Sequence, residues 1–170
     1  MSFDKAFELL MVNEVNGMPD GGYVNNPDDP GGETKYGISK RAYPDTDIAG
    51  LTEEGAKAIY HQDYWDAHQC DAMPWAVGWV FFDCAVNHGA HEAIKWLQGA
   101  LSLPADGVLG PQTLAAVARV SDPIRAARVI QLRRLQHILR ALFRLLFLIG
   151  ESAVNQIRCQ SGNGTNSCTD

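Results

Sequence analysis

Glu14 is the residue of this sequence best placed for acid–base chemistry. It extends an apolar stripe at helical spacing, which is formed by Phe3, Phe7 and Leu10. Burial at the end of such a stripe disfavours the charged form of a carboxyl, and the negative end of the helix dipole acts in the same direction. A carboxyl that holds its proton near neutral pH can act as a general acid. The alternative is a surface glutamate at a helix end.

The segment after Glu14 predicts a loop and then a small β element. Residues 17–32 are dense in Gly, Pro, Asp and Asn, which excludes regular structure there. Thr34 to Ser39 predict a short strand or a hairpin arm. Further on, Thr52 is placed to cap a helix that runs to about Trp65, and Pro74 opens an almost wholly apolar helix that Gly89 ends. A helix that apolar is expected to be central and buried.

Several segments together resemble the glycoside hydrolase family 108 N-acetylmuramidases, which include phage endolysins and proteins once called secretion activators. The segments that carry the resemblance are FELLMVNE (7–14), GGYVNNPDDPGGETKYGISKRAYP (21–44), LTEEGAKAIYHQDYW (51–65), FFDCAVNHGAHEAIKWLQ (81–98) and DGVLGPQTL (106–114). The resemblance implies a mainly α (α+β) fold: a lysozyme-like helical domain with a small β element beside the catalytic helix. It also implies hydrolysis of the β-1,4 bond between N-acetylmuramic acid and N-acetylglucosamine in peptidoglycan.

The sequence departs from the family pattern next to its glutamate. In the family the glutamate directly precedes Gly-Gly-Tyr, whereas here residues 15–20 intervene and Asp20 adjoins Gly21. Aligning the helix makes Glu14 the catalytic acid, and aligning the loop makes it Asp20. We prefer Glu14, because the apolar stripe gives it a partly desolvated environment and Asp20 lies in a Pro/Gly turn.

The resemblance implies further site residues. In a lysozyme-like cleft, Asp29 and Thr34 would face Glu14, Asp29 to steady the developing positive charge or orient a water, and Thr34 to hold that water. The alternatives are an Asx-turn at Asp29 and a plain strand residue at Thr34. The candidates for substrate binding are Tyr23, Tyr36, Tyr64, Trp65 and Asn87. Tyr64 and Trp65 would stack on sugars or else pack in the core, and Asn87, with Asp83 one turn earlier, would line the cleft or fix a neighbouring loop.

Charge separates the chain into an acidic body and a basic end. The net charge is −6, while residues 124–170 hold seven Arg against Glu151 and Asp170, or +5, which leaves −11 for the rest. An acidic body argues against nucleic acid as a partner. The expected partner is peptidoglycan, bound by a monomer. No cofactor or metal is expected, because proton transfer and charge stabilisation carry glycoside cleavage.

The C-terminal part predicts a wall-binding region followed by an amphipathic helix. Asp106 to Leu114 resemble the turn and helix of small peptidoglycan-binding modules. Residues 132–149 predict a helix with one apolar and one basic face. That helix would either close the core or contact an anionic membrane surface. The expected organisation is a catalytic region over 1–90, a helical region over 91–150 and a disordered tail over 151–170, in which Cys159 and Cys168 are close enough to bridge.

We expect an endolysin-type muramidase that is made in the cytoplasm without a signal peptide and reaches the wall after holin-dependent release. Two alternatives stay open. A lytic transglycosylase would use the same glutamate and leave 1,6-anhydro ends, and a non-catalytic wall-binding or secretion-accessory protein would not need it.

Overall fold

The computed structural model describes residues 2–15, 17–26 and 31–161, with the side chains of all of these except Asn13 and residues 148–161. Its contacts divide the chain into two compact units, Met1–Gln131 and Leu132–Asp170. Asp29, Cys168 and the end of the expected tail lie outside the described residues.

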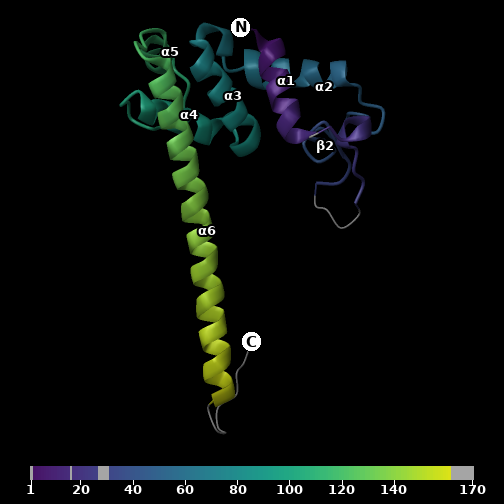
Figure 1. Cartoon of the computed structure of the whole chain (residues 1–170), viewed down its shortest axis with the longest axis vertical. Coiled ribbons are helices and arrows are strands. Elements are labelled where there is room, and N and C mark those ends of the chain that lie inside the picture. Colours follow the sequence, from purple (N-terminus) through teal and green to yellow (C-terminus); the bar gives the residue numbers. More distant parts are fainter. Residues whose placement is uncertain (1, 16, 27–30, 162–170) are drawn as a thin grey trace. The chain divides into compact units, whose positions relative to one another are not determined.

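The first unit is mainly helical (Figure 1). Its longer helices are α1 (Phe3–Glu14), α2 (Glu53–Tyr60), α3 (Trp75–His88), α4 (Ala90–Ala100), α5 (Pro111–Ala118) and the first part of α6 (Pro123–Ser161). Short helical turns are η1 (Pro19–Gly22), the π-helical η2 (His61–Asp66) and η3 (Cys70–Ala72). This confirms the mainly α fold expected from the sequence.

The β element is a two-stranded antiparallel hairpin formed by β1 (Thr34–Lys35) and β2 (Ile38–Ser39). Thr34 pairs with Ser39, and Lys35 pairs with Ile38. An isolated bridge between Val24 and Thr34 ties the preceding loop to the hairpin. The structure therefore confirms the expected hairpin arm, with Tyr36 and Gly37 as its turn.

Helix α3 lies at the centre of the core. Val77, Phe81, Phe82, Cys84 and Ala85 on it are buried, which fits a helix almost without a polar face. Helices α1 and α4 pack against α3, and the aromatic rings of Phe3, Trp65 and Phe82 meet in the core at centroid distances of 5.5 to 6.0 Å. Cys70 and Cys84 are buried as thiols and are not in a disulfide.

Helix starts follow the capping residues read from the sequence. The Thr52 hydroxyl accepts the backbone N–H of Gly55 at 3.1 Å at the start of α2, and Pro111 occupies the first turn of α5. Helix α6 ends later than expected: it continues to Ser161, into the segment expected to be disordered.

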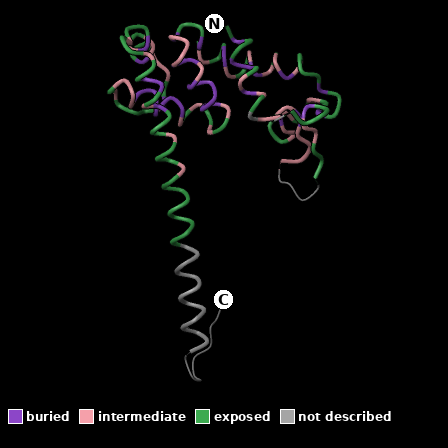
Figure 2. Tube along the Cα trace, viewed as in Figure 1, coloured by how far each residue is buried: buried purple, intermediate pink, exposed green. Residues whose placement is uncertain are grey.

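The second unit consists, in its described part, of the α6 residues from Leu132 on. Figure 2 shows buried residues distributed through the first unit, whereas residues 132–147 of α6 are exposed except for the intermediate Arg134 and Ile138. No helix in the described part of the chain is long and apolar enough to cross a membrane.

Candidate active site

Glu14 is the last residue of α1, and the packing of that helix determines where it lies. Phe3, Phe7 and Leu10 are buried in the core, so the face that ends in Glu14 is turned inward. Glu14 itself is half-buried. Within the described part of the chain, its carboxyl makes no hydrogen bond or ion pair. A proton on this carboxyl is therefore not donated in a hydrogen bond to another described group.

The turn of the β1–β2 hairpin lies against the Glu14 carboxyl. A Cβ atom at Gly37 would stand 3.1 Å from Oε2 of Glu14 and 2.8 Å from the hydroxyl oxygen of Tyr60. Both side chains thus reach the same point of the backbone. Gly37 also has φ +75°, and with Tyr36 at φ +51° it forms the kind of two-residue turn that joins tight hairpins. Glycine is required at position 37 for its backbone angle and for the space it leaves.

Tyr60 fixes the hairpin to α2 beside Glu14. Its hydroxyl donates to the backbone carbonyl of Tyr36 at 2.9 Å. Burial raises the pKa of Tyr60, and the nearby negative charge of Glu14 raises it further. The phenol therefore keeps its proton and its hydrogen bond at any pH the enzyme meets. Nothing in the sequence around Tyr60 distinguished it from an ordinary core tyrosine.

The surroundings of Glu14 raise the pKa of its carboxyl. Burial is the larger cause, and the charge of Asp83 on α3 adds to it. Asp83 is itself buried, and the side-chain amide of Asn87 donates to its Oδ1 at 3.2 Å and to its backbone carbonyl at 2.9 Å. Asn87 thus holds an acidic residue near Glu14. This is a positioning role within α3.

Asp20, the other candidate acid, lies in a different environment. Its side chain is 73% exposed and forms an ion pair with Lys35 at 3.1 Å. Lys35 is buried and also donates to the carbonyl of Ala49 at 3.0 Å. The carboxyl of Asp20 is thus mostly exposed and engaged by Lys35, so it lacks the partly buried surroundings of the Glu14 carboxyl. Asp20 instead anchors the loop between α1 and the hairpin.

Gly21 and Tyr36 hold the same loop against the hairpin. The backbone N–H of Tyr36 donates to the carbonyl of Gly21 at 2.8 Å. A Cβ atom at Gly21 would overlap the ring of Tyr36, so the glycine leaves room for this ring. Tyr36 therefore packs against the loop, and the next residue, Gly37, adjoins Glu14.

Thr34 lies in β1, two residues before Tyr36. Its backbone N–H and carbonyl pair with Val24 at 2.8 and 2.9 Å, and its side chain is half-buried. Among the described residues no contact joins its hydroxyl to Glu14. Its proposed partner in catalysis, Asp29, lies outside the described residues.

Tyr23 takes part in a polar cluster that the sequence did not reveal. Its hydroxyl donates to Oε1 of Glu33 at 3.1 Å, and the Asn25 amide donates to the same oxygen at 3.3 Å. Burial and the neighbouring carboxylate raise the pKa of Tyr23. Glu33 directly precedes Thr34, so this cluster places a second carboxylate at the start of the hairpin.

Trp65 is in the core and does not reach the surface. It is 2% exposed, and its ring packs against Phe3, Trp75 and Phe82. A ring this deeply buried cannot stack on a sugar, so Trp65 is a core residue. Tyr64, its neighbour in η2, is half-buried and lies 5.7 Å from Tyr60 between ring centroids.

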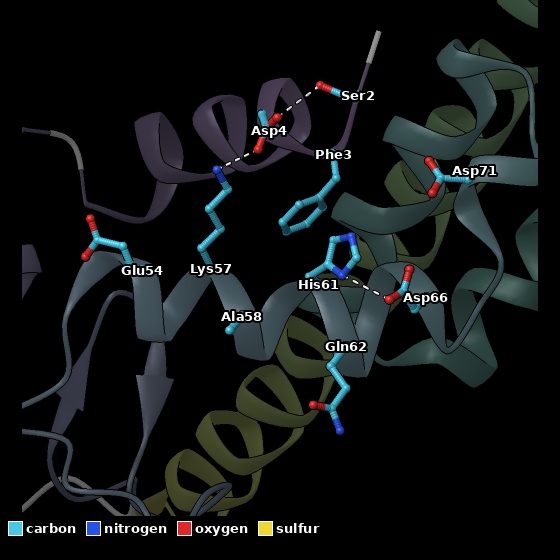
Figure 3. Close-up of a pocket in the computed structure, with 10 residues that line it drawn as sticks. All are labelled: Ser2, Phe3, Asp4, Glu54, Lys57, Ala58, His61, Gln62, Asp66 and Asp71. Carbon is cyan, nitrogen blue, oxygen red and sulfur yellow. Dashed lines mark hydrogen bonds and ion pairs between the residues drawn. The ribbon is translucent and has the colours of Figure 1, made fainter.

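A surface cavity of about 690 Å³ lies at the other end of α1 (Figure 3). Two ion pairs lie in its lining: Lys57 with Asp4 at 2.6 Å, and His61 with Asp66 at 2.9 Å. The ring of Phe3 meets His61 edge-on. Glu14 does not line this cavity. The candidate acid therefore lies away from this cavity, at the opposite end of α1.

A buried amide organises the turn before α5. The Gln98 side chain donates to Asp106 at 2.6 Å and to the carbonyl of Val108 at 3.0 Å, and it accepts the backbone N–H of Gly107 at 3.0 Å. It also donates to the buried hydroxyl of Thr113 at 3.2 Å. Hydrogen bonds from the Val108 N–H and from Gln98 lower the pKa of Asp106. The Asp-Gly-Val-Leu-Gly-Pro segment is therefore a fixed structural element.

Comparisons with known proteins assign the two parts of the chain to known families. Residues 17–89 match the family described as glycosyl hydrolase 108, and residues 89–117 match a peptidoglycan binding domain family. The first match begins three residues after Glu14. A solved structure, "Structure of Brucella abortus SagA", is 30% identical, covers 93% of this chain and 92% of its own, and superposes with a TM-score of 0.68. No curated protein matches the sequence.

Proposed function

The chain belongs to the glycosyl hydrolase 108 family and is a glycoside hydrolase acting on peptidoglycan, and we propose that it is an N-acetylmuramidase with Glu14 as its general acid. The bond cleaved would be the β-1,4 linkage between N-acetylmuramic acid and N-acetylglucosamine. The observation that carries this proposal is the half-buried Glu14 carboxyl, held against Gly37 with its pKa raised.

Glycoside cleavage needs a proton on the leaving oxygen and stabilisation of a positively charged sugar. A carboxyl with a raised pKa holds the proton at neutral pH and loses it to the leaving group in the transition state. After the transfer, Glu14 is an anion next to the developing positive charge, which further favours the transition state. Gly37 adjoins the carboxyl, and Tyr60 holds the hairpin turn that carries Gly37 through its bond to Tyr36.

The opposite side of the sugar ring needs a nucleophile or an activated water. In our proposal Asp29, or a water held by Thr34, serves this side. Tyr23, Tyr36 and Tyr64 would contact the glycan, and residues 89–117 would hold the enzyme on the wall. We propose a monomeric enzyme with an endolysin role, which meets its substrate after release from the cytoplasm.

Clearing of purified peptidoglycan tests the proposal. Wild type, Glu14→Gln and Asp20→Asn would be compared, because the two variants make the same chemical change at the two candidate acids. We expect Glu14→Gln to lose at least about 100-fold in rate, the usual size of a general-acid contribution, while keeping the wall bound in a pull-down. Asp20→Asn should retain most of its activity, apart from a loss through the weakened Lys35 contact.

Each competing interpretation predicts a different result. If Asp20 is the acid, Asp20→Asn abolishes clearing and Glu14→Gln does not. If the protein only binds wall, none of the three proteins clears it and all three sediment with it. A lytic transglycosylase would clear the wall and lose activity with Glu14→Gln, but its fragments would carry 1,6-anhydro ends.

A further inference from the structure

Residues 132–147 of α6, here named the amphipathic segment, present apolar side chains to solvent. The side chains that are 50% to 74% exposed are Leu132, Leu135, Leu139, Leu142, Phe143, Leu145, Leu146 and Phe147. Earlier in the same helix, Ala126, Ala127 and Ile130 are buried. Among the described side chains of α6, those near its beginning therefore contribute to the core. A contiguous exposed apolar surface of this kind marks a site of interaction.

The other face of the amphipathic segment is cationic. Successive helix residues are rotated by about 100°, which places the apolar side chains on an arc about 200° wide, from Leu145 through Leu139 to Phe147. Arg133, Arg140 and Arg144 fall on the opposite arc with His137, and Arg134 lies beside Leu145 at its edge. The sequence has no Asp or Glu from residue 123 to residue 150. The segment is thus apolar on one side and uniformly positive on the other.

A second copy of the chain fits this surface poorly. The leucines at 132, 135, 139, 142 and 146 alternate in steps of three and four, as in a coiled coil. However, the positions flanking that seam hold Ile138, Phe143 and Leu145, where coiled coils usually carry complementary charges. Pairing along the leucines would leave these three side chains in water, and a larger bundle would bring the like-charged arginines of several copies together.

An anionic lipid surface accommodates both faces. A helix with a wide apolar arc and an Arg-rich polar face lies in the membrane interface, with apolar side chains at the acyl boundary and cations at the headgroups. We infer that residues 132–147 bind the surface of an anionic phospholipid bilayer. This inference goes beyond the proposed hydrolase and does not depend on it. It would hold the enzyme at the membrane, next to the wall that it degrades.

Vesicle co-sedimentation of the full chain tests the inference. The probes are vesicles of phosphatidylcholine alone and vesicles in which a third of the lipid is phosphatidylglycerol. Two double variants address the two faces: Arg140→Gln/Arg144→Gln and Leu139→Gln/Leu146→Gln. The matched control, Arg119→Gln/Arg125→Gln, makes the same charge change within residues 1–131. The side chains of all three pairs are solvent-exposed, and circular dichroism would confirm that each variant folds.

We expect the wild type to bind the anionic vesicles, less so as salt rises, and to bind neutral vesicles weakly. Loss of the two segment arginines should weaken partitioning about 30-fold, since each contributes about a factor of five. Loss of the two leucines should weaken it about 100-fold or more. The control should bind like the wild type.

Three outcomes would overturn the inference: equal binding to both kinds of vesicle, an equal loss in the control, or no binding at all. In the last case, concentration-dependent association that the leucine variant abolishes would assign the segment to a second copy. The same preparations would be tested for clearing of purified wall. A failure of clearing with lipid binding intact counts against the hydrolase alone, and the reverse counts against the lipid surface alone.

Discussion

The carboxyl of Glu14 lies against the backbone of Gly37, so closely that a Cβ atom there would stand 3.1 Å from Oε2. The two residues are far apart in the sequence, and they meet because α1 ends where the β1–β2 hairpin turns. This contact fixes the candidate acid at the β element, and the Tyr60 hydroxyl approaches the same point.

Replacing Gly37 by alanine should therefore impair catalysis. The added methyl would push on both the Glu14 carboxyl and the Tyr60 hydroxyl, and the backbone at φ +75° would be strained as well. We expect a loss of about 10- to 100-fold in the rate of wall clearing, because small displacements of a catalytic group have effects of this size. The matched control is Gly17→Ala, since Gly17 has φ +69° but nothing within 4 Å of its Cβ position. Equal losses in both variants would mean that backbone strain alone, and not contact with Glu14 and Tyr60, causes the loss of activity.

Asp83→Asn should shift the pH profile of the enzyme. The charge of Asp83 raises the pKa of Glu14, so its removal lowers that pKa. A general acid works while protonated, and the rate falls as pH rises through its pKa. The alkaline limb of kcat/KM should thus move to lower pH in the variant. Asn keeps an oxygen that can accept the hydrogen bond from Asn87. A pH profile that moves in the other direction, or not at all, would contradict an effect of the Asp83 charge on the pKa of the catalytic acid.

Glu14→Gln should make the stability of the protein less sensitive to a rise from acidic to neutral pH. The folded-state pKa of Glu14 lies above its ordinary value, so folding favours the protonated form. The stability that Glu14 contributes is fully present below its unfolded-state pKa and is lost as pH rises through the folded-state pKa. An uncharged glutamine at this half-buried position has no such loss. Thermal unfolding followed from acidic to neutral pH should show Tm of the wild type falling relative to the variant. Parallel curves would contradict the raised pKa.

Gln98→Ala should destabilise the turn before α5 and weaken wall binding. The substitution leaves the buried Thr113 hydroxyl and the Gly107 N–H without their partner, and unpaired buried groups cost about 1 to 3 kcal/mol each. We expect a clear fall in Tm and in the amount of protein retained on peptidoglycan. Gln112→Ala changes the same residue type at an exposed position nearby and should leave both unchanged. If the Gln98 variant is fully retained on the wall, the turn before α5 does not contribute to peptidoglycan binding.

Local signals allowed much of the fold to be predicted. Thr52, Pro74, Gly89 and Pro111 mark helix ends because their effects on the backbone act within a few residues. The apolar run of α3 indicated a central helix, and the spacing from Phe3 to Glu14 indicated an inward face. These inferences hold because period and capping are properties of a single element.

The site's contacts were harder to predict, because they join elements distant in sequence. Nothing local pairs Asp20 with Lys35 or Tyr23 with Glu33, and nothing local places Tyr60 beside Glu14. The sequence allowed Trp65 either to stack on a sugar or to pack in the core, since an aromatic ring serves both. For residues 132–147 the amphipathic pattern was clear, but only the structure shows that the apolar face is exposed.

The most direct test of the central claim is digestion of purified peptidoglycan in water labelled with heavy oxygen, with mass spectrometry of the fragments from wild type and Glu14→Gln. We predict that the wild type releases fragments whose reducing N-acetylmuramic acid ends carry the label, and that Glu14→Gln releases almost none. Unlabelled 1,6-anhydro ends would contradict hydrolysis, and labelled ends released by Glu14→Gln at the wild-type rate would contradict the role of Glu14.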